Sequence, residues 1–454
     1  MTTVGSNGLS SHDTIVAVAS AHGRGAVALV RLSGPDAFEI VRKHVDVWPE
    51  QPRFAQLADF SSDGQRLDQV LITTFPAPHS YTGEDIVEIS THGGLVVPNS
   101  IVAVLTRSGA RQAAAGEFTR RAVFNGKIDI LQAEAIGDLI DAKSRAMQDI
   151  ALAQLDGGLS RRLLGLRGQL LEVEALIAYD VDFPEEDDGP IPCERVERAI
   201  DALLSSLDAL LATAPAAEIV REGAVVVIAG PPNAGKSSLF NALIGKSRAI
   251  VTEIPGTTRD ALEAVVDGGT WPLRLVDTAG LRDTADRIER MGIEVSERYL
   301  AAAEVVLVCA ESAANLDYAI RFVRERTRAT VQPVLTKTDL VTNRDKFDSA
   351  IAVSAETGEG LQKLLARVEG IVGEHCGPRS PDVPMLTRAR HIQALSEARS
   401  EIAEFQAAWA DRRLPSTVAA VHLRTAVTSL EELVGTVDVE DVLDRVFSSF
   451  CVGK

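Results

Sequence analysis

The sequence predicts a multidomain fold in which an α+β domain precedes an all-α helical domain, and the helical domain is split by an inserted α/β domain. Three observations lead to this expectation. Short apolar runs separated by Gly, Pro and Ser fill residues 13–127, and Leu and Ala recur at helical spacing over residues 131–211 and 386–450. Strand and helix patterns alternate between residues 224 and 372. A chain of 454 residues is long enough for about three domains.

The elements follow from these patterns in order. In the front domain we predict strands over Ile15–Ala19, Ala26–Leu32, Val70–Phe75 and Ile86–Ile89. In the helical domain, stretches such as LQAEAIGDLIDAKSRAMQDIALAQL are interrupted only by FPEEDDGPIP, so long helices are expected. The run AVVVIAG, which begins at Ala224, predicts a buried parallel strand that enters a Gly-rich turn.

The composition describes a folded and acidic protein. Hydrophobic residues make up 46% of the chain, which excludes a disordered or collagen-like protein. The 46 Lys and Arg against 64 Asp and Glu give a net charge of -18, which argues against a surface that coats nucleic acid or an anionic membrane. The four cysteines have no disulfide or zinc-site spacing, and no leader or membrane-spanning run is visible. We therefore expect a cytoplasmic protein without a membrane partner.

A phosphate-binding loop follows the strand at Ala224. The segment GPPNAGKS, residues 230–237, fits the pattern GxxxxGK[ST] and precedes a helical segment. Its glycines let backbone N–H groups turn toward a β-phosphate, Lys236 neutralises phosphate oxygens, and the Ser237 hydroxyl can ligate Mg²⁺. The predicted nucleotide contacts of this loop are Asn233, Ala234, Gly235, Lys236, Ser237 and Ser238.

Other parts of a GTPase follow in the expected order. Thr257 and Thr258 come about 20 residues after the loop, where a second hydroxyl can reach the metal. The strand 273–276 leads into Asp277, Thr278, Ala279 and Gly280, whose carboxylate can hold the Mg²⁺ shell and whose glycine amide can sense a γ-phosphate.

A base-recognition segment completes the set. The strand at Val334 ends in Thr336, Lys337, Thr338 and Asp339, and an aspartate here can accept the N1–H and 2-amino protons of guanine, which adenine lacks. Ser354, Ala355 and Glu356 suit the last base-contacting loop. The order of these segments predicts a Ras-like P-loop domain that binds GTP rather than ATP.

Two positions depart from the usual GTPase pattern. Leu281 stands where Ras-like enzymes carry a water-orienting Gln, so another residue must position the water. The missing positive charge could come from an arginine or from a monovalent cation, to which Asn233 offers an uncharged oxygen. Thr336 replaces the Asn of NKxD and lacks the amide that would lie between the base and the P-loop.

Longer stretches show a family resemblance over essentially residues 13–454. The segments HSYTGEDIVEISTHGG, GEFTRRAVFNGKIDILQAEAIGDLIDA, EVEALIAYDVDFPEED and RVFSSFCVGK are similar to those of the MnmE (TrmE) family of tRNA-modifying GTPases. The resemblance implies a tetrahydrofolate-binding and dimerisation domain over 1–127, a helical domain over 128–217 and 375–454, and a GTPase domain over 218–374. It also implies a homodimer that joins the flavoprotein MnmG, which uses FAD and NADH, in a heterotetramer. Together they would add an aminomethyl or carboxymethylaminomethyl group to C5 of the wobble uridine U34 of tRNA.

The resemblance also assigns roles to single residues. A 5,10-methylene- or 5-formyl-tetrahydrofolate would contact Arg31, Glu88, Lys127 and the terminal Lys454. Nucleotide and K⁺ contacts would come from the loop of Thr252, Glu253, Ile254, Pro255, Gly256, Thr257 and Thr258. The metal ligands would be Ser237 and Thr258 for Mg²⁺, and Asn233, Thr252, Ile254 and Thr257 for K⁺. Glu289 would position the attacking water, and Cys451 would be either a nucleophile toward the folate-bound carbon or a small core residue.

Several alternatives stay open at this point. The chain could be a GTP-dependent assembly switch without substrate chemistry, or a folate-binding carrier whose GTPase domain is only regulatory. The amine donor could be ammonium or glycine. Since the chain is acidic, its RNA contacts are expected to be local, and the candidate basic patches are Arg107, Arg111, Arg120 and Arg121, and Arg161, Arg162 and Arg167.

Overall fold

The computed structural model describes residues 13–21, 23–182, 193–246, 262–267, 271–277, 299–340, 350–376, 384–411, 416–435 and 453. The chain divides into two compact units. The first unit comprises Met1–Gly137 and Glu431–Lys454, and the second comprises Asp138–Leu430.

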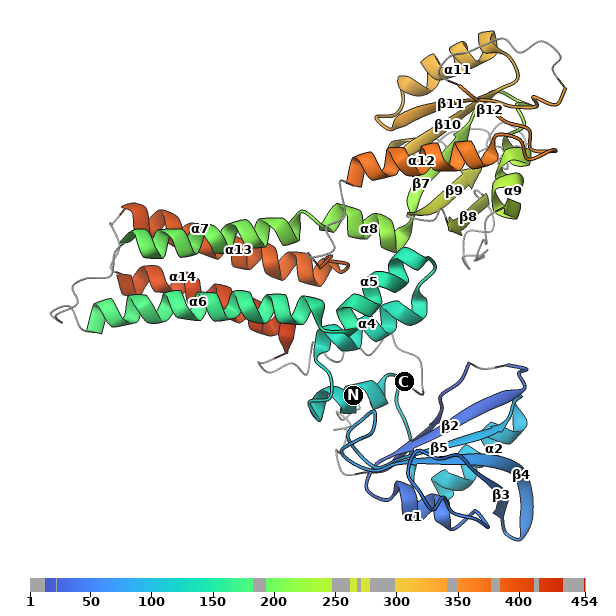
Figure 1. The fold of residues 1–454 in the computed structure, drawn as a ribbon, viewed down its shortest axis with the longest axis vertical. Coiled ribbons are helices and arrows are strands. Elements are labelled where there is room, and N and C mark those ends of the chain that lie inside the picture. The colour runs from blue at the N-terminus through green and yellow to red at the C-terminus, as the bar shows by residue number, and fades with distance from the viewer. Residues whose placement is uncertain are drawn as a thin grey trace, which may run out of the picture. The chain divides into compact units, whose positions relative to one another are not determined.

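The first unit is built on a six-stranded sheet in the order β3-β4-β5-β2-β1-β6 (Figure 1). Its strands are β1 (Ile15–Val18), β2 (Val27–Ser33), β3 (Gln56–Ser62), β4 (Gln65–Phe75), β5 (Ile86–His92) and β6 (Arg111–Gln112). All neighbours are antiparallel except β1 and β6. The four predicted strands are confirmed, whereas β3 and β6 were not predicted. Strand β3 escaped notice because only Ala58 and Phe60 of its seven residues are buried, so its apolar signal is weak.

The two faces of this sheet have different surroundings. Alternate residues such as Val30 and Leu32 on β2, and Val87 and Ile89 on β5, lie in a core with helices α1 (Ala37–Arg42) and α2 (Val96–Arg107). Side chains of successive strand residues point to opposite faces. Residues between these core positions therefore lie on the other face, whose small cluster includes Phe118 of α3 (Glu117–Phe124).

The helical part consists of more and shorter segments than predicted. Its first half forms α4 (Ile130–Asp141), α5 (Arg145–Leu155), α6 (Gly158–Asp182), α7 (Cys193–Leu211) and α8 (Ala214–Glu222). The expectation that only FPEEDDGPIP interrupts it is wrong. Helix α5 starts anew because the Ser144 hydroxyl accepts a hydrogen bond from the Met147 N–H at 3.2 Å, and Gly157, with φ of +78°, ends it.

Four long helices of the second unit pack as a bundle. Helices α6 and α7 lie with α13 (Ala389–Asp411) and α14 (Ser416–Val434) (Figure 1). Heptad-like spacing explains the packing, because α7 buries Val196, Ile200, Leu203, Leu207 and Leu210 on one face. By length and composition alone, the segment Glu194–Glu222 could cross a membrane, and a third of its most apolar part is buried inside the protein.

The inserted domain contains a second six-stranded sheet in the order β12-β11-β10-β7-β9-β8. The strands are β7 (Ala224–Ala229), β8 (Leu262–Asp267), β9 (Pro272–Asp277), β10 (Val305–Ala310), β11 (Thr330–Leu335) and β12 (Ile351–Ala352). All pairs are parallel except β8 with β9. Alternate residues of β7 and β10 lie in two cores, one with α9 (Lys236–Lys246) and α12 (Leu361–Cys376), the other with α11 (Ala313–Arg324). Burial on both faces explains why these strands are continuous apolar runs.

Candidate functional site

The predicted nucleotide segments meet at one edge of the second sheet. Strands β7, β9, β10 and β11 are parallel, and their carboxyl ends lead into the P-loop, Asp277, Glu311 and the TKTD segment. The chain moves from β7 to β9 on one side and then returns to β10 on the other side, so the strand order reverses beside β7. Ligands of open α/β sheets bind in the crevice at such a point.

The P-loop closes tightly over β10. Gly230 has a φ of +147°, and a Cβ at this position would lie only 2.2 Å from the Cys309 carbonyl oxygen. Only glycine fits this conformation and this approach. Asn233 and Gly235 also have positive φ, at +61° and +76°, and the Asn233 side chain is exposed.

Three polar side chains at this sheet edge, Lys236, Asp277 and Ser237, have well-defined surroundings. Lys236 is buried, and its Nζ donates hydrogen bonds to the carbonyl oxygens of Gly230 at 3.0 Å and Pro231 at 2.8 Å. Asp277 is fully buried at the end of β9, opposite Ile228 of β7. Ser237 is exposed at the start of α9, so its hydroxyl is accessible to a metal ion bound at this edge.

Cys309 lies between these groups and is inert. Its side chain is fully buried, and burial raises the pKa of the Cys309 thiol to about 12. The thiol is therefore protonated at neutral pH, so it serves packing rather than nucleophilic chemistry.

Thr336 compensates for the missing asparagine in a way that the sequence did not indicate. It is 4% exposed, and its hydroxyl donates to the Ala234 carbonyl oxygen at 2.7 Å, with the Ala310 carbonyl oxygen 3.2 Å away. Because Ala234 belongs to the P-loop, the hydroxyl links the phosphate-binding loop to the base-binding segment. This link is the connection that we expected the side chain of Thr336 to lack.

The rest of the TKTD segment is positioned by its neighbours. Ser354 is fully buried, and its hydroxyl donates to Asp339 Oδ1 at 2.6 Å, which orients the exposed Asp339 carboxylate. Lys337 forms an ion pair with Glu311. The Thr338 hydroxyl is buried and has no hydrogen-bond partner among the described residues.

The remaining GTPase predictions fall outside the described residues. These are Thr252, Glu253, Ile254, Pro255, Gly256, Thr257, Thr258, Thr278, Ala279, Gly280, Leu281 and Glu289. Ala355 and Glu356 are described and directly follow Ser354. Within the described part of the chain, no group of three or more His, Cys, Asp or Glu could hold a metal ion.

The predicted folate residues of the first unit form two adjoining groups. Arg31 of β2 and Glu88 of β5 lie opposite each other in the strand register. Arg31 Nε and one terminal nitrogen donate to Glu88 Oε1 at 2.9 and 2.7 Å. The Arg31 guanidinium also lies 5.5 Å from the centre of the Tyr81 ring and 5.8 Å from that of Phe118. Sequence reasoning missed these two aromatic residues, although Tyr81 lies in the quoted SYTGED segment.

Lys127, three residues after the end of α3, contacts the loop that contains Pro78 and Gly83. Its Nζ donates to the Pro78 carbonyl oxygen at 2.9 Å, and its side chain would lie 3.4 Å from a Cβ placed on Gly83. Gly453 is buried where a Cβ would be 2.2 Å from the Val18 carbonyl oxygen, so the backbone of Gly453 packs closely on β1. Cys451 and Lys454 lie outside the described residues.

Two of the four arginines in one predicted basic patch, Arg111 and Arg121, form ion pairs within the protein. Arg121 is 6% exposed and forms ion pairs with Asp13 at 2.5 Å, Glu117 at 3.1 Å and Glu84 at 3.2 Å. Arg111 pairs with Asp13 at 2.7 Å and with Glu117 at 2.6 Å. These arginines join β6, α3 and the 80–84 loop, so they are structural and cannot serve as a free RNA surface.

The same network sets the ionisation of its acids. Burial alone would raise the pKa of Glu117, but hydrogen bonds from Arg111 and from the Ala114 N–H lower the pKa below its ordinary value. The same opposition of burial and two arginines lowers the pKa of Asp13. Both acids are therefore charged at neutral pH.

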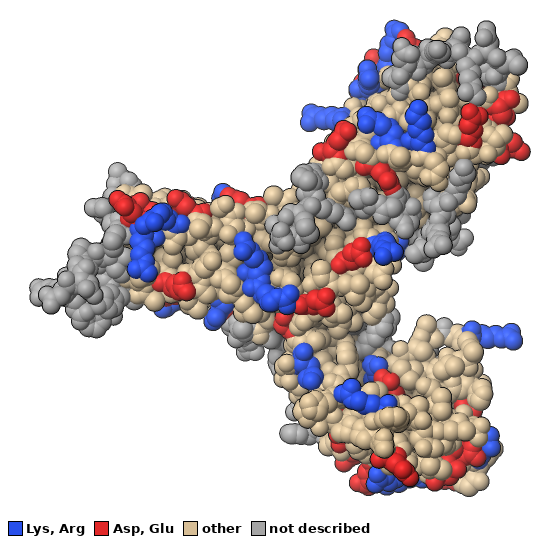
Figure 2. All heavy atoms as spheres, in the orientation of Figure 1, with Lys and Arg blue, Asp and Glu red and all other residues tan. Residues whose placement is uncertain are grey.

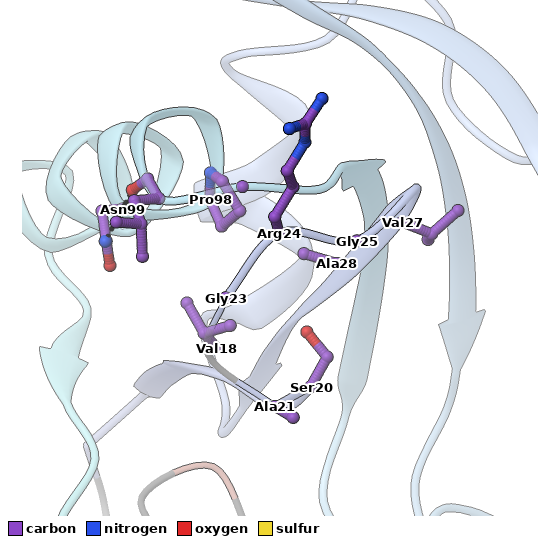
Figure 3. Close-up of a pocket in the computed structure, with 12 residues that line it drawn as sticks. Val18, Ser20, Ala21, Gly23, Arg24, Gly25, Val27, Ala28, Pro98 and Asn99 are labelled. Carbon is purple, nitrogen blue, oxygen red and sulfur yellow. Dashed lines mark hydrogen bonds between the residues drawn. The ribbon is translucent and has the colours of Figure 1, made fainter.

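A pocket of about 360 Å³ lies elsewhere in the first unit. Figure 3 shows Val18, Ser20 and Ala21 on one side, Pro98 and Asn99 of α2 on another, and the Gly-rich residues 23–25 between them. Among the described folate candidates, neither Arg31, Glu88 nor Lys127 lines this pocket. The Arg31–Glu88 pair, on the sheet face away from the main core, remains the predicted folate position.

Comparisons with known proteins cover almost the whole chain. Residues 14–127 match the family described as the GTP-binding protein TrmE N-terminus, and residues 130–451 match the MnmE helical domain. Three relatives bear the name tRNA modification GTPase MnmE. The protein of Moorella thermoacetica is 40% identical and that of Neisseria meningitidis serogroup B is also 40% identical, each over 97% of this chain and 99% of the relative. The protein of Aquifex aeolicus is 37% identical over 97% of this chain and 100% of the relative.

A solved structure, the G domain of the T. maritima FeoB iron transporter, is 26% identical over 34% of this chain and 99% of its own. Its TM-score of 0.27 is too low to carry an argument about the fold. The family matches and the full-length relatives agree with the motifs described above. This chain belongs to the MnmE (TrmE) family of tRNA modification GTPases.

Proposed function

We propose that this chain is a K⁺-stimulated, cytoplasmic GTPase that acts with the flavoprotein MnmG on the wobble uridine U34 of tRNA. It would add an aminomethyl or carboxymethylaminomethyl group at C5, with the carbon from a one-carbon tetrahydrofolate and the amine from ammonium or glycine. The observation that carries the proposal is the convergence of the P-loop, Asp277 and TKTD at one sheet edge, in a chain whose first unit presents the Arg31–Glu88 pair.

The nucleotide would be held at both ends by groups that are already oriented. Backbone N–H groups of the P-loop and Lys236 would bind the phosphates, and Lys236 would exchange its carbonyl contacts for phosphate oxygens. The Asp339 carboxylate, oriented by Ser354, would accept the N1–H and the 2-amino group of guanine. The Thr336 hydroxyl would keep these two subsites in register.

Two metal ions would supply positive charge at the phosphates. Ser237 and Thr258 would ligate Mg²⁺ with Asp277 in its outer shell, and the exposed Asn233 would offer its side-chain oxygen to K⁺. The loop of residues 252–257 would complete the K⁺ site. Glu289 would position the attacking water, because Leu281 cannot accept or donate a hydrogen bond with its side chain.

The folate would bind on the sheet face of the first unit that carries the Arg31–Glu88 pair. Glu88 Oε1 already accepts two hydrogen bonds from Arg31, so its second oxygen would accept N–H donors of the pterin. Arg31, Tyr81 and Phe118 would present one cationic and two aromatic surfaces to the ring system. Lys127 and Lys454 would neutralise the glutamate tail, and Cys451 would lie near the one-carbon unit.

The domain organisation would divide these tasks. Residues 1–127 would bind folate and form the homodimer, 128–217 and 375–454 would form the helical domain, and 218–374 would hydrolyse GTP. GTP hydrolysis would drive a change of conformation and would take no direct part in carbon transfer.

A reconstituted reaction tests the proposal. The full chain, the flavoprotein, tRNA, methylene-tetrahydrofolate, GTP and ammonium or glycine are combined in KCl, and U34 is analysed by mass spectrometry. We expect the modified nucleoside with the wild-type chain and none with Lys236→Ala. Arg31→Ala should weaken folate binding and block modification while GTP hydrolysis continues. If no modified uridine forms with all components present, the proposed chemistry is refuted.

A further inference from the structure

Helix α11 of the GTPase domain carries an exposed stripe of aromatic and arginine side chains. Tyr318 and Phe322 are spaced four residues apart and therefore lie on one face of the helix, and Arg326 follows two residues after its last residue, Arg324. Tyr318 is 74% exposed and Phe322 is 47% exposed, although aromatic residues make up only 4% of the chain. The opposite face of the helix packs into the core through Leu316 and Ile320. The aromatic rings are therefore not needed to hold the helix in place.

Arginines surround this stripe. The Arg326 guanidinium lies 3.7 Å from the centre of the Phe322 ring, and it also donates to the Phe322 carbonyl oxygen at 2.8 Å. Arg321 pairs with Asp317, while Arg324 and Arg328 are exposed and form no ion pair with any described residue. Figure 2 shows Lys and Arg side chains gathered on the side of this domain that carries α11. Residues 313–330 contain four arginines and two acids, in a chain with a net charge of -18.

The stripe extends away from the nucleotide site. Helix α11 begins directly after the carboxyl end of β10, at the edge that holds the P-loop. It must then run back along the sheet, because the parallel strand β11 starts at Thr330, near the opposite edge. Arg324, Arg326 and Arg328 therefore lie near the edge remote from the P-loop. Changes there can be tested without altering the GTP site.

From these observations we infer that the α11 stripe, Tyr318, Phe322 and Arg326 with Arg324 and Arg328, is a contact surface for unpaired nucleotides of the tRNA. Exposed aromatic rings and guanidinium planes are stacking surfaces for bases, and the flanking arginines pair with phosphates. The surface is positively charged within an acidic chain, which favours an anionic partner over a basic or apolar protein. Among anionic partners, the exposed aromatic rings favour RNA, because its bases can stack on them. The inference rests on the proposed tRNA substrate and adds where part of that tRNA binds.

Two double variants of the full chain separate stacking from charge. Tyr318→Ala with Phe322→Ala should weaken binding of a tRNA transcript about five- to tenfold and leave its salt dependence unchanged. Arg324→Ala with Arg328→Ala should also weaken binding and should lower the slope of log affinity against log salt by about 1 to 2. The control is Arg195→Ala with Arg198→Ala on the exposed face of α7, which should change neither quantity. Fluorescence anisotropy measures binding, and GTP hydrolysis should stay at the wild-type rate in all variants.

The outcomes distinguish this inference from the proposed function. If the wild-type chain binds no tRNA, the tRNA part of the proposed function fails. If the wild-type chain binds tRNA and both α11 variants bind it equally well, only the α11 inference is overturned. If the variants keep tRNA binding but lose association with the flavoprotein, the stripe is a protein interface and the RNA assignment is wrong.

Discussion

The link between Thr336 and the P-loop leads to a prediction that can be worked out in detail. Thr336→Val keeps the shape of the side chain and replaces the hydroxyl with a methyl group. The change removes the 2.7 Å hydrogen bond to the Ala234 carbonyl oxygen, whose residue is 2% exposed. The Ala310 carbonyl oxygen keeps its hydrogen bond from the Thr336 N–H at 2.9 Å, so only the Ala234 carbonyl oxygen loses the hydrogen bond from Thr336.

Loss of a buried hydrogen bond costs about 1–3 kcal/mol, part of which will appear as lower protein stability. The remainder appears as weaker nucleotide binding, because the loops for base and phosphate are no longer held together before GTP arrives. We expect the affinity for GDP and GTP to fall about three- to tenfold, which corresponds to about 0.7–1.4 kcal/mol.

Equilibrium titration with a fluorescent GDP analogue measures the change in nucleotide affinity. Thermal unfolding measures the part of the cost that appears as lower protein stability. Thr336→Ser retains the hydroxyl and should stay within about twofold of the wild type, since it can donate the same hydrogen bond. If Thr336→Val binds GDP as tightly as Thr336→Ser, the hydroxyl does not organise the site and the reasoning is refuted.

Three further predictions concern other parts of the structure. Gly230→Ala should lower GTP affinity at least about tenfold, because its Cβ would collide with the Cys309 carbonyl oxygen. The control is Gly245→Ala in α9, where the added Cβ meets open space, and this variant should bind GTP normally. Unaltered GTP binding by Gly230→Ala would contradict the close approach of the P-loop to β10. The lowered pKa of Glu117 means that its charge stabilises the first unit at neutral pH and that this contribution is lost as pH falls below its ordinary value of 4.5. Glu117→Gln should therefore cost about 3 kcal/mol of unfolding free energy at pH 7 and should flatten the loss of stability below a pH of about 5. Urea unfolding followed by ¹⁹F NMR of fluorotryptophan at Trp48 measures both effects, and an unchanged pH profile would exclude this role. Replacing K⁺ with Na⁺ should slow GTP hydrolysis at least about tenfold in a turnover assay, and equal rates would remove the monovalent cation from the account.

Local patterns were sufficient to predict the parts of the fold that depend on neighbouring residues. The buried strand at Ala224 was visible because both faces of β7 are covered, and the P-loop was visible because its glycines and Lys236 must lie within a few residues of one another. The heptad spacing of α7 likewise predicted a helix. The two helix breaks at 142–144 and 156–157 were missed because their capping residues, Ser144 and Gly157, lie within otherwise unbroken helical composition.

Contacts between distant parts of the chain could not be predicted from pattern. The Arg121–Asp13 pair joins residues 108 positions apart, so the sequence showed a basic cluster where the structure has a neutralised network. The Thr336–Ala234 hydrogen bond spans 102 positions, and it links the P-loop to the TKTD segment where the sequence showed only that the amide of Asn is missing. The aromatic neighbours of Arg31 were hidden for the same reason, since Tyr81 and Phe118 reach it only through the folded sheet.

The most direct test of the central claim is mass spectrometry of wobble uridines in tRNA from cells that lack this protein. The account predicts that C5-aminomethyl or carboxymethylaminomethyl uridine disappears from U34, returns when the wild-type chain is supplied, and does not return with Lys236→Ala. Normal levels of the modified uridine in the deletion strain would contradict the claim that this GTPase is required for the modification.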